Sequence, residues 1–104
     1  MTLVGGSTEN VKAVVLVQLE GRTEQEEKKI ESIFADFLAE FFAAEKKHPK
    51  WPKDAVRAVS ILSEEAGEAV QAVNSYEDEG GALEAVRHEI RQTGAMAIRA
   101  LLHM

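Results

Sequence analysis

Apolar residues recur at helical spacing along three long stretches of the chain, and this periodicity is the feature that most constrains its fold. The first stretch follows Thr23-Glu24-Gln25-Glu26, a capping box in which the threonine hydroxyl and the second glutamate satisfy free amides at a helix start. It ends before Pro49, because the residue before a proline disfavours the helical conformation. One helix is therefore predicted from Thr23 to about His48.

The apolar face of this first helix is wide. It comprises Ile30, Phe34, Phe37 and Phe41 on one stripe, flanked by Ile33, Leu38 and Phe42. Packing is the ordinary role of such a stripe. Its width favours two contacts, one with the chain's own helices and one with another subunit.

Two further helices follow. Asp54 is a plausible N-cap for a helix to about Tyr76, and Asp78-Glu79-Gly80-Gly81 predicts a turn before a last helix from about Ala82 to Leu102. Their apolar stripes are predicted to be Ala55, Val59, Leu62, Ala66, Ala69, Val70 and Val73 in the first, and Leu83, Val86, Ile90, Ala97 and Leu101 in the second. With two prolines and 45% hydrophobic residues, the sequence predicts an all-α helical bundle, completed by oligomerisation.

Residues 1–22 are predicted to form an N-terminal extension, and residues 23–104 the helical domain. Within the extension, Val11–Leu19 has the β-branched content of a strand, whereas Ser7 or Thr8 would cap a helix. We favour a helix, because a lone strand would find a partner only across a subunit interface.

Charge and composition exclude several classes of protein. A formal net charge of −6 opposes binding to a nucleic acid polymer, which requires an excess of Lys and Arg on the contact face. Val11–Leu19 is too short, and is interrupted by Lys12, so it is not expected to span a membrane. The absence of cysteine and of a recognisable signal peptide favours a cytoplasmic protein.

The central polar feature is a group of three carboxylates, Glu64, Glu65 and Glu68, inside the second helical stretch. On a helical wheel centred on Leu62, Glu65 lies about 60° to one side and Glu68 about 120° to the same side. Glu64 points nearly away from the stripe. On the last helix, Glu89 and Gln92 have about the same two offsets from Val86, in the same rotational sense.

These matched offsets predict that the four side chains meet. The short turn makes the two helices antiparallel, and residues displaced in the same sense then line one groove. Counted back from the turn, Glu65 and Glu68 lie about 17–22 Å along their helix, and Glu89 and Gln92 about 14–19 Å along theirs. Carboxylate and amide oxygens without Cys or His favour Mg²⁺, or Mn²⁺, as the bound metal ion. The alternative is that these side chains are simply solvated.

The connector between the first two helices, His48-Pro49-Lys50-Trp51-Pro52-Lys53-Asp54, is basic and carries the chain's only tryptophan. Trp51 would serve structurally as a cap on the end of the bundle. An aromatic face beside Lys50 and Lys53 would equally suit the base and phosphates of a nucleotide. We therefore take Trp51, Lys50 and Lys53 as candidate substrate-binding residues.

Glu64-Glu65-Ala66-Gly67-Glu68, followed some twenty residues later by Glu89-x-x-Gln92, resembles the EExxE…ExxD signature of the MazG-like, all-α nucleoside triphosphate pyrophosphohydrolases. The resemblance extends from about residue 25 to the C-terminus, and over this range the sequence is similar to a small phage- or cassette-type branch of the superfamily. It implies Mg²⁺-dependent cleavage of a (d)NTP to (d)NMP and pyrophosphate, as in house-cleaning of nucleotide pools. It also implies metal ligands at Glu65, Glu68 and Glu89. Glu64 and Glu65 are predicted to be catalytic, with Glu64 turned away from the centre of the groove and suited either to bind a second ion or to orient the attacking water. We expect a homodimer or homotetramer.

Gln92 is the departure from that signature, since the family has an aspartate there. An amide oxygen can still bind Mg²⁺, but it supplies no charge and cannot act as a base. A nucleotide- or metal-binding protein without turnover, or a helical dimerisation module, is therefore the alternative. Glu45-x-x-His48 also has the spacing of a di-iron ligand pair, but no second pair matches it.

Overall fold

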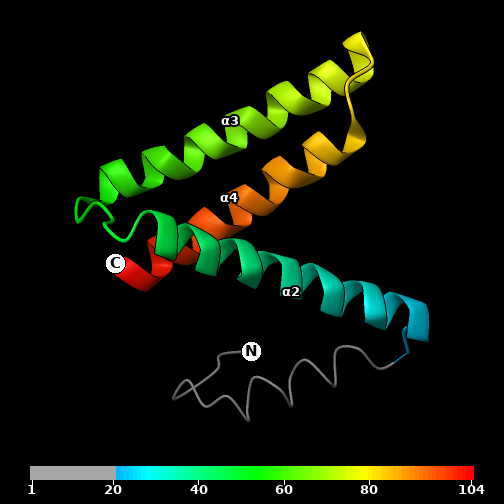
Figure 1. Ribbon diagram of the computed structural model, residues 1–104, viewed down its shortest axis with the longest axis horizontal. Helices are drawn as coiled ribbons and strands as arrows, with labels where there is room; N and C mark the ends of the chain where they lie inside the picture. Colours follow the sequence, from blue (N-terminus) through cyan, green and yellow to red (C-terminus); the bar gives the residue numbers. More distant parts are fainter. Residues whose placement is uncertain (1–20) are drawn as a thin grey trace. The chain divides into compact units, whose positions relative to one another are not determined.

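The computed structural model describes residues 21–104, so the predicted helix over Val11–Leu19 lies outside the described residues. This part of the chain contains three helices and no strand, which confirms the all-α prediction: α2 spans Glu24–Lys47, α3 spans Ala55–Glu79 and α4 spans Leu83–His103 (Figure 1). The chain divides into two compact units, the first ending at Ser32 and the second covering residues 33–104. All the site residues discussed below belong to the second unit.

The helix boundaries follow the predicted caps. The Glu26 amide donates to Thr23 Oγ1 at 3.1 Å, which confirms the threonine half of the capping box at the start of α2. Among the described residues, the Glu26 carboxylate accepts from the Thr23 hydroxyl and from Arg22 rather than from a backbone amide. The Val56 amide donates to Asp54 Oδ1 at 3.0 Å at the start of α3. This helix continues to Glu79 rather than ending near Tyr76, because Gly80 takes the left-handed conformation (φ 71°) that terminates it.

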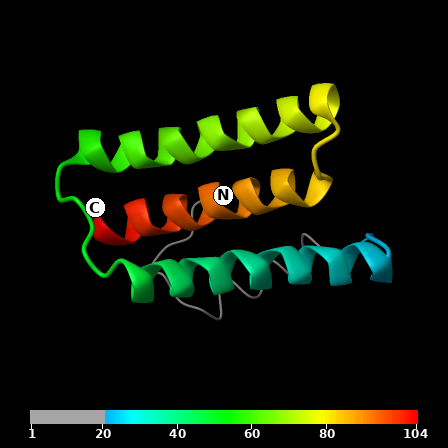
Figure 2. The ribbon, with the colours of Figure 1, turned by 45° about the horizontal axis from the view of Figure 1, so that its top comes forward.

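Helices α3 and α4 form an antiparallel hairpin around the turn that follows Glu79 (Figures 1 and 2). Theirs is the most extensive helix pairing in the described residues. Residues 33–47 of α2 also pack on α4, where Phe41 joins Ala95 and Met96 in a buried cluster. A Cβ at Gly94 would lie 3.1 Å from the Phe37 ring, so glycine permits this close approach.

The predicted apolar stripes were partly wrong. On α4, Leu83, Ile90 and Leu101 are 41%, 50% and 75% exposed, and on α3 Val59 and Val70 are also exposed. Val86 of α4 is buried as predicted, and Ala58 of α3 and Ala95, Met96 and Ala100 of α4, which were not in the predicted stripes, are buried as well. Because small alanine side chains let helices approach closely, they occupy the packed faces and leave the larger residues outside.

The same difference is seen on α2. Phe41 is buried and Phe37 is half-buried, whereas Phe34, Leu38 and Phe42 are exposed. The contact with the chain's own helices is therefore present, and the second contact, with another subunit, stays a prediction.

Candidate metal centre

Three carboxylates meet between α3 and α4. Glu65, Glu68 and Glu89 each offer one oxygen, and these oxygens all lie within 4.8 Å of one another. Glu65 and Glu68 are three residues apart and so share a face of α3, while the antiparallel hairpin brings Glu89 of α4 to the same height. This is the convergence that the matched wheel offsets predict for three of the four residues.

Proximity and burial disfavour the charged forms of Glu65 and Glu89. The pKa of Glu65 is raised above its ordinary value of 4.5 by burial and then by the negative charges of Glu68 and Glu89. The pKa of Glu89 is raised by burial and by its hydrogen bond with Glu68. None of the three takes part in a salt bridge within the part of the chain that is described. The cluster is thus a concentration of negative charge without a basic partner.

One atom of the cluster lacks any partner. Glu89 Oε2 is buried and accepts no hydrogen bond from the described residues. Leaving a buried acceptor unsatisfied costs about 1–3 kcal/mol, and more when it is charged. A divalent cation would satisfy this oxygen and neutralise the cluster, and an all-oxygen donor set fits Mg²⁺ or Mn²⁺ rather than zinc.

Glu64 stands apart from this group. It is exposed on α3 and is not one of the three converging carboxylates. Its charge contributes to the raised pKa of Glu65, as the smallest of the causes. Any catalytic part for Glu64 would therefore be played from the rim of the site.

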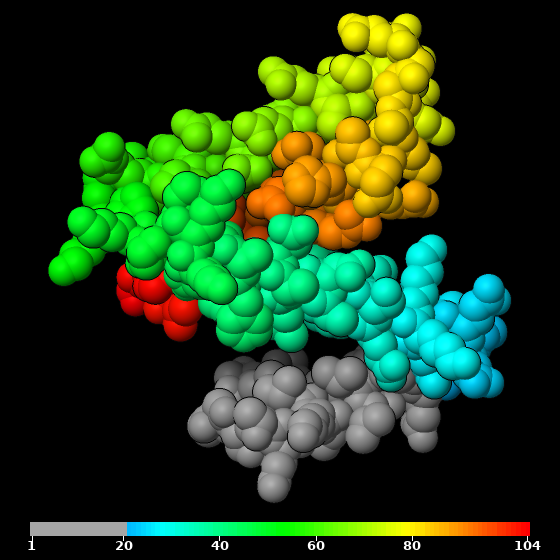
Figure 3. Space-filling view, viewed as in Figure 1, coloured from blue at the N-terminus to red at the C-terminus, as the bar shows by residue number. Residues whose placement is uncertain are grey.

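Beside the carboxylates lies a cavity of about 610 Å³. Its lining includes the acidic and amide residues Glu40, Glu65 and Gln92. It also includes Trp51 and the basic residues Lys47, His48, Lys50, His88 and Arg99. The space-filling view shows the orange surface of α4 between α3 and α2 (Figure 3). The cavity therefore offers both a cation-binding and an anion-binding lining.

The basic connector is tied to the end of α4. Trp51 is half-buried, the Arg99 guanidinium lies 4.7 Å from its ring centre, and the His103 ring stacks at 6.1 Å. Arg99 is only 3% exposed and donates to the His48 carbonyl. Trp51 thus packs against the bundle end and also lines the cavity. Lys50 lines the cavity too, whereas Lys53 is exposed and lies outside its lining.

Glu45 is also occupied at this end of the bundle. One of its oxygens lies 2.7 Å from His103 Nε2, and the other lies 3.6 Å from Arg99 Nε. Glu45 and the His48 carbonyl therefore both contact residues of α4.

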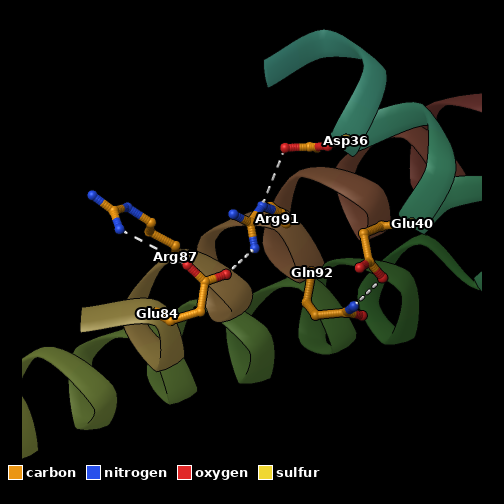
Figure 4. A network of polar contacts seen from close by, with 6 residues as sticks. All are labelled: Asp36, Glu40, Glu84, Arg87, Arg91 and Gln92. Atoms are coloured by element: carbon orange, nitrogen blue, oxygen red, sulfur yellow. Dashed lines mark hydrogen bonds and ion pairs between the residues drawn. The ribbon is translucent and has the colours of Figure 1, made fainter. Parts of the chain in front are cut away.

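Gln92 is placed differently from the three glutamates. Its amide Nε2 donates to Glu40 Oε2 at 2.5 Å (Figure 4). Sequence reasoning missed Glu40, although a signal existed: it lies three residues after Phe37 and four before Ala44, on the face of α2 that packs against α4.

Comparison with known proteins adds no relative: no family model, no curated protein and no solved structure matches the chain. Within residues 21–104, no helix is both long and apolar enough to cross a membrane.

Proposed function

We propose that this protein is a Mg²⁺-dependent nucleoside triphosphate pyrophosphohydrolase that converts a (d)NTP and water to a (d)NMP and pyrophosphate. The observation that carries the proposal is the meeting of Glu65, Glu68 and Glu89 within 4.8 Å, with one buried oxygen unpartnered, beside a cavity that also has a basic lining. The resemblance of Glu64–Glu68 and Glu89-x-x-Gln92 to the MazG-like signature supports the same reaction.

The carboxylates divide the work of the reaction. Glu65, Glu68 and Glu89 hold the cation, and Gln92 adds a neutral oxygen donor. When bound, Mg²⁺ would supply charge neutralisation for the phosphates and a lowered pKa for a bound water. Glu64 and Glu65 orient the attacking water and accept its proton as the bond between the α- and β-phosphates breaks.

The cavity provides groups that would bind the phosphates and the base of the substrate. Lys50, with its neighbour Lys47, provides positive charge for phosphate oxygens, and Trp51 provides an aromatic surface for a base. Lys53 contributes only through its charge, because it lies outside the cavity lining. Such a protein would act on nucleotide pools in the cytoplasm as a homodimer or homotetramer.

The test is incubation of the purified protein with a panel of ribo- and deoxyribonucleoside triphosphates and Mg²⁺, with products resolved by ion-exchange chromatography. We expect monophosphate and pyrophosphate from at least one substrate. Glu68→Gln should lower kcat by at least about a hundredfold with helix content unchanged. Glu77→Gln, an exposed change on the same helix, is the matched control and should retain activity. Failure of every triphosphate to yield both products would contradict the enzyme proposal.

One observation favours a second candidate, a nucleotide- or metal-binding protein without turnover. The residue at the fourth ligand position is an amide whose nitrogen is engaged by Glu40. Cation binding without product formation would identify this candidate. A helical dimerisation module would show neither, and its thermal stability would not respond to Mg²⁺.

A further inference from the structure

Glu40 links a third helix to Gln92, the fourth residue predicted to bind the metal. It lies on α2 and is half-buried, and its Oε2 accepts the hydrogen bond from Gln92 of α4. Glu40, Gln92 and Glu65 line the same cavity. One turn earlier on α2, Asp36 lies 3.7 Å from Arg91 Nε, the residue before Gln92 (Figure 4). Two successive turns of α2 are thus linked to two successive residues of α4.

The hydrogen bond fixes which way the Gln92 amide faces. An ionised carboxylate only accepts hydrogen bonds, so the group that faces Glu40 must be the NH₂ of the amide. The amide oxygen is attached to the same carbon and points away from the nitrogen. Oε1 is therefore the atom that Gln92 has available for a cation.

Charge gives the contact a second meaning. Glu65, Glu68, Glu89 and Gln92 carry one negative charge fewer than a set of four carboxylates would. The Glu40 carboxylate lies directly behind the amide, at 2.5 Å from Nε2. A negative charge on Glu40 would polarise the amide, so that Oε1 would become a stronger donor to a cation.

We propose that Glu40 is a positioning residue of the metal centre, which orients Gln92 toward the cation and supplies from α2 the charge that position 92 lacks. This inference rests on the cation-binding part of the proposed function but not on turnover. Its consequence is that the centre is built from three helices, so that docking of α2 and cation affinity depend on each other.

A purely structural tie between α2 and α4 would behave differently. The contact between Asp36 and Arg91 is such a tie, since it links the same two helices one turn away and neither residue lines the cavity. Asp36→Asn is therefore a matched control. It removes one negative charge from α2, as Glu40→Gln does, but leaves Gln92 in place.

The experiment is calorimetric titration of the metal-free protein with Mn²⁺. Glu40→Gln should weaken binding by about tenfold, within the range found when partners of metal ligands are removed. Asp36→Asn should change affinity by less than about twofold, because a charge exposed to solvent is largely screened. In the double variant Glu40→Gln, Gln92→Glu the donor and acceptor are exchanged and the charge is kept, so affinity should return to within about threefold of the wild type.

Circular dichroism and thermal unfolding accompany each titration, so that loss of folding is separated from loss of a ligand. If Glu40→Gln does not fold, the double variant decides: restored Mn²⁺ binding supports the proposal, and a folded protein without binding overturns it. Equal affinity in the wild type and Glu40→Gln, or equal losses in Glu40→Gln and Asp36→Asn, would overturn the role of Glu40 alone. Absence of binding by the wild type would overturn the metal centre itself.

Discussion

Glu89 has both a buried oxygen without a hydrogen-bond partner among the described residues and a raised pKa. The oxygen is Oε2, and burial together with the neighbouring Glu68 raises the pKa of the carboxyl group. Glu65 lies within the same group of oxygens and adds a third negative charge when all are ionised. Protonation of Glu65 and Glu89 is therefore favoured in the metal-free site, and a divalent cation would take the place of the proton.

The first prediction concerns pH. The pKa values of Glu65 and Glu89 are raised above 4.5 in the folded protein, so the folded state binds these protons more tightly than the unfolded chain. Their contribution to stability is therefore fully present below pH 4.5 and is lost as pH rises through the raised values. This loss of stability should lower the thermal midpoint of the metal-free protein as pH rises above 4.5.

Comparison with Glu89→Gln isolates this component, because glutamine does not titrate. The stability difference between the variant and the wild type should move in favour of the variant as pH rises from 4.5 toward neutrality. Saturating Mg²⁺ should reverse the order at neutral pH, since only the wild type keeps the full ligand set. A difference that stays constant with pH would contradict the raised pKa of Glu89.

At the scale of the helix, replacing each of two glycines with alanine is predicted to have opposite effects on stability. A Cβ at Gly67, on the exposed side of α3, would meet no atom within 4 Å, whereas a Cβ at Gly94 of α4 would lie 3.1–3.2 Å from the Phe37 ring. Gly67→Ala should raise the free energy of unfolding by about 0.5–1 kcal/mol, because alanine loses less backbone entropy in a helix.

Gly94→Ala should lower the free energy of unfolding, because overpacking costs about 1–3 kcal/mol and exceeds the gain in helix propensity of about 1 kcal/mol. Urea unfolding of both variants measures the two effects side by side. An equal gain from both substitutions would show that α2 does not pack on α4 at Phe37.

The helices themselves were predictable, and so was the meeting of Glu65, Glu68 and Glu89. Both depend on local signals: the caps at Thr23 and Asp54, the left-handed glycine after Glu79, and the wheel offsets within a short hairpin. Such signals are contained in a few consecutive residues, so a single sequence reveals them.

The face that each helix turns inward was less predictable. Periodicity shows that α4 has apolar residues, but it does not show whether Ile90 or Ala95 will be covered by the chain's own helices. The contact between Gln92 and Glu40 was out of reach for a related reason. It joins residues 52 positions apart and depends on how α2 docks, which no local pattern encodes.

At the scale of the whole molecule, exposed apolar side chains are the feature that a single chain leaves unexplained. Phe34, Phe42 and Leu101 are 58%, 63% and 75% exposed. Large apolar surfaces of this kind are usual where subunits associate. We therefore expect a homodimer or homotetramer, in agreement with the wide apolar face of α2.

Light scattering coupled to size-exclusion chromatography tests this expectation. The wild type should have at least twice the mass of one chain, and Phe42→Glu should shift the equilibrium toward the monomer, because a buried unpaired charge disfavours association. Lys46→Glu, an exposed change of charge near the end of α2, is the control and should leave the mass unchanged. A wild type that stays monomeric at every concentration that chromatography can reach would contradict the prediction.

We propose that the carboxylates between α3 and α4 direct Mg²⁺-dependent cleavage between the α- and β-phosphates. The most direct measurement is the identity of the products in water enriched in heavy oxygen, followed by ³¹P NMR and mass spectrometry, with and without EDTA. We predict monophosphate and pyrophosphate, one heavy oxygen in each product pair, and no reaction once EDTA removes the metal. Diphosphate and inorganic phosphate as products, a rate unaffected by EDTA, or no hydrolysis of any nucleoside triphosphate would contradict the account.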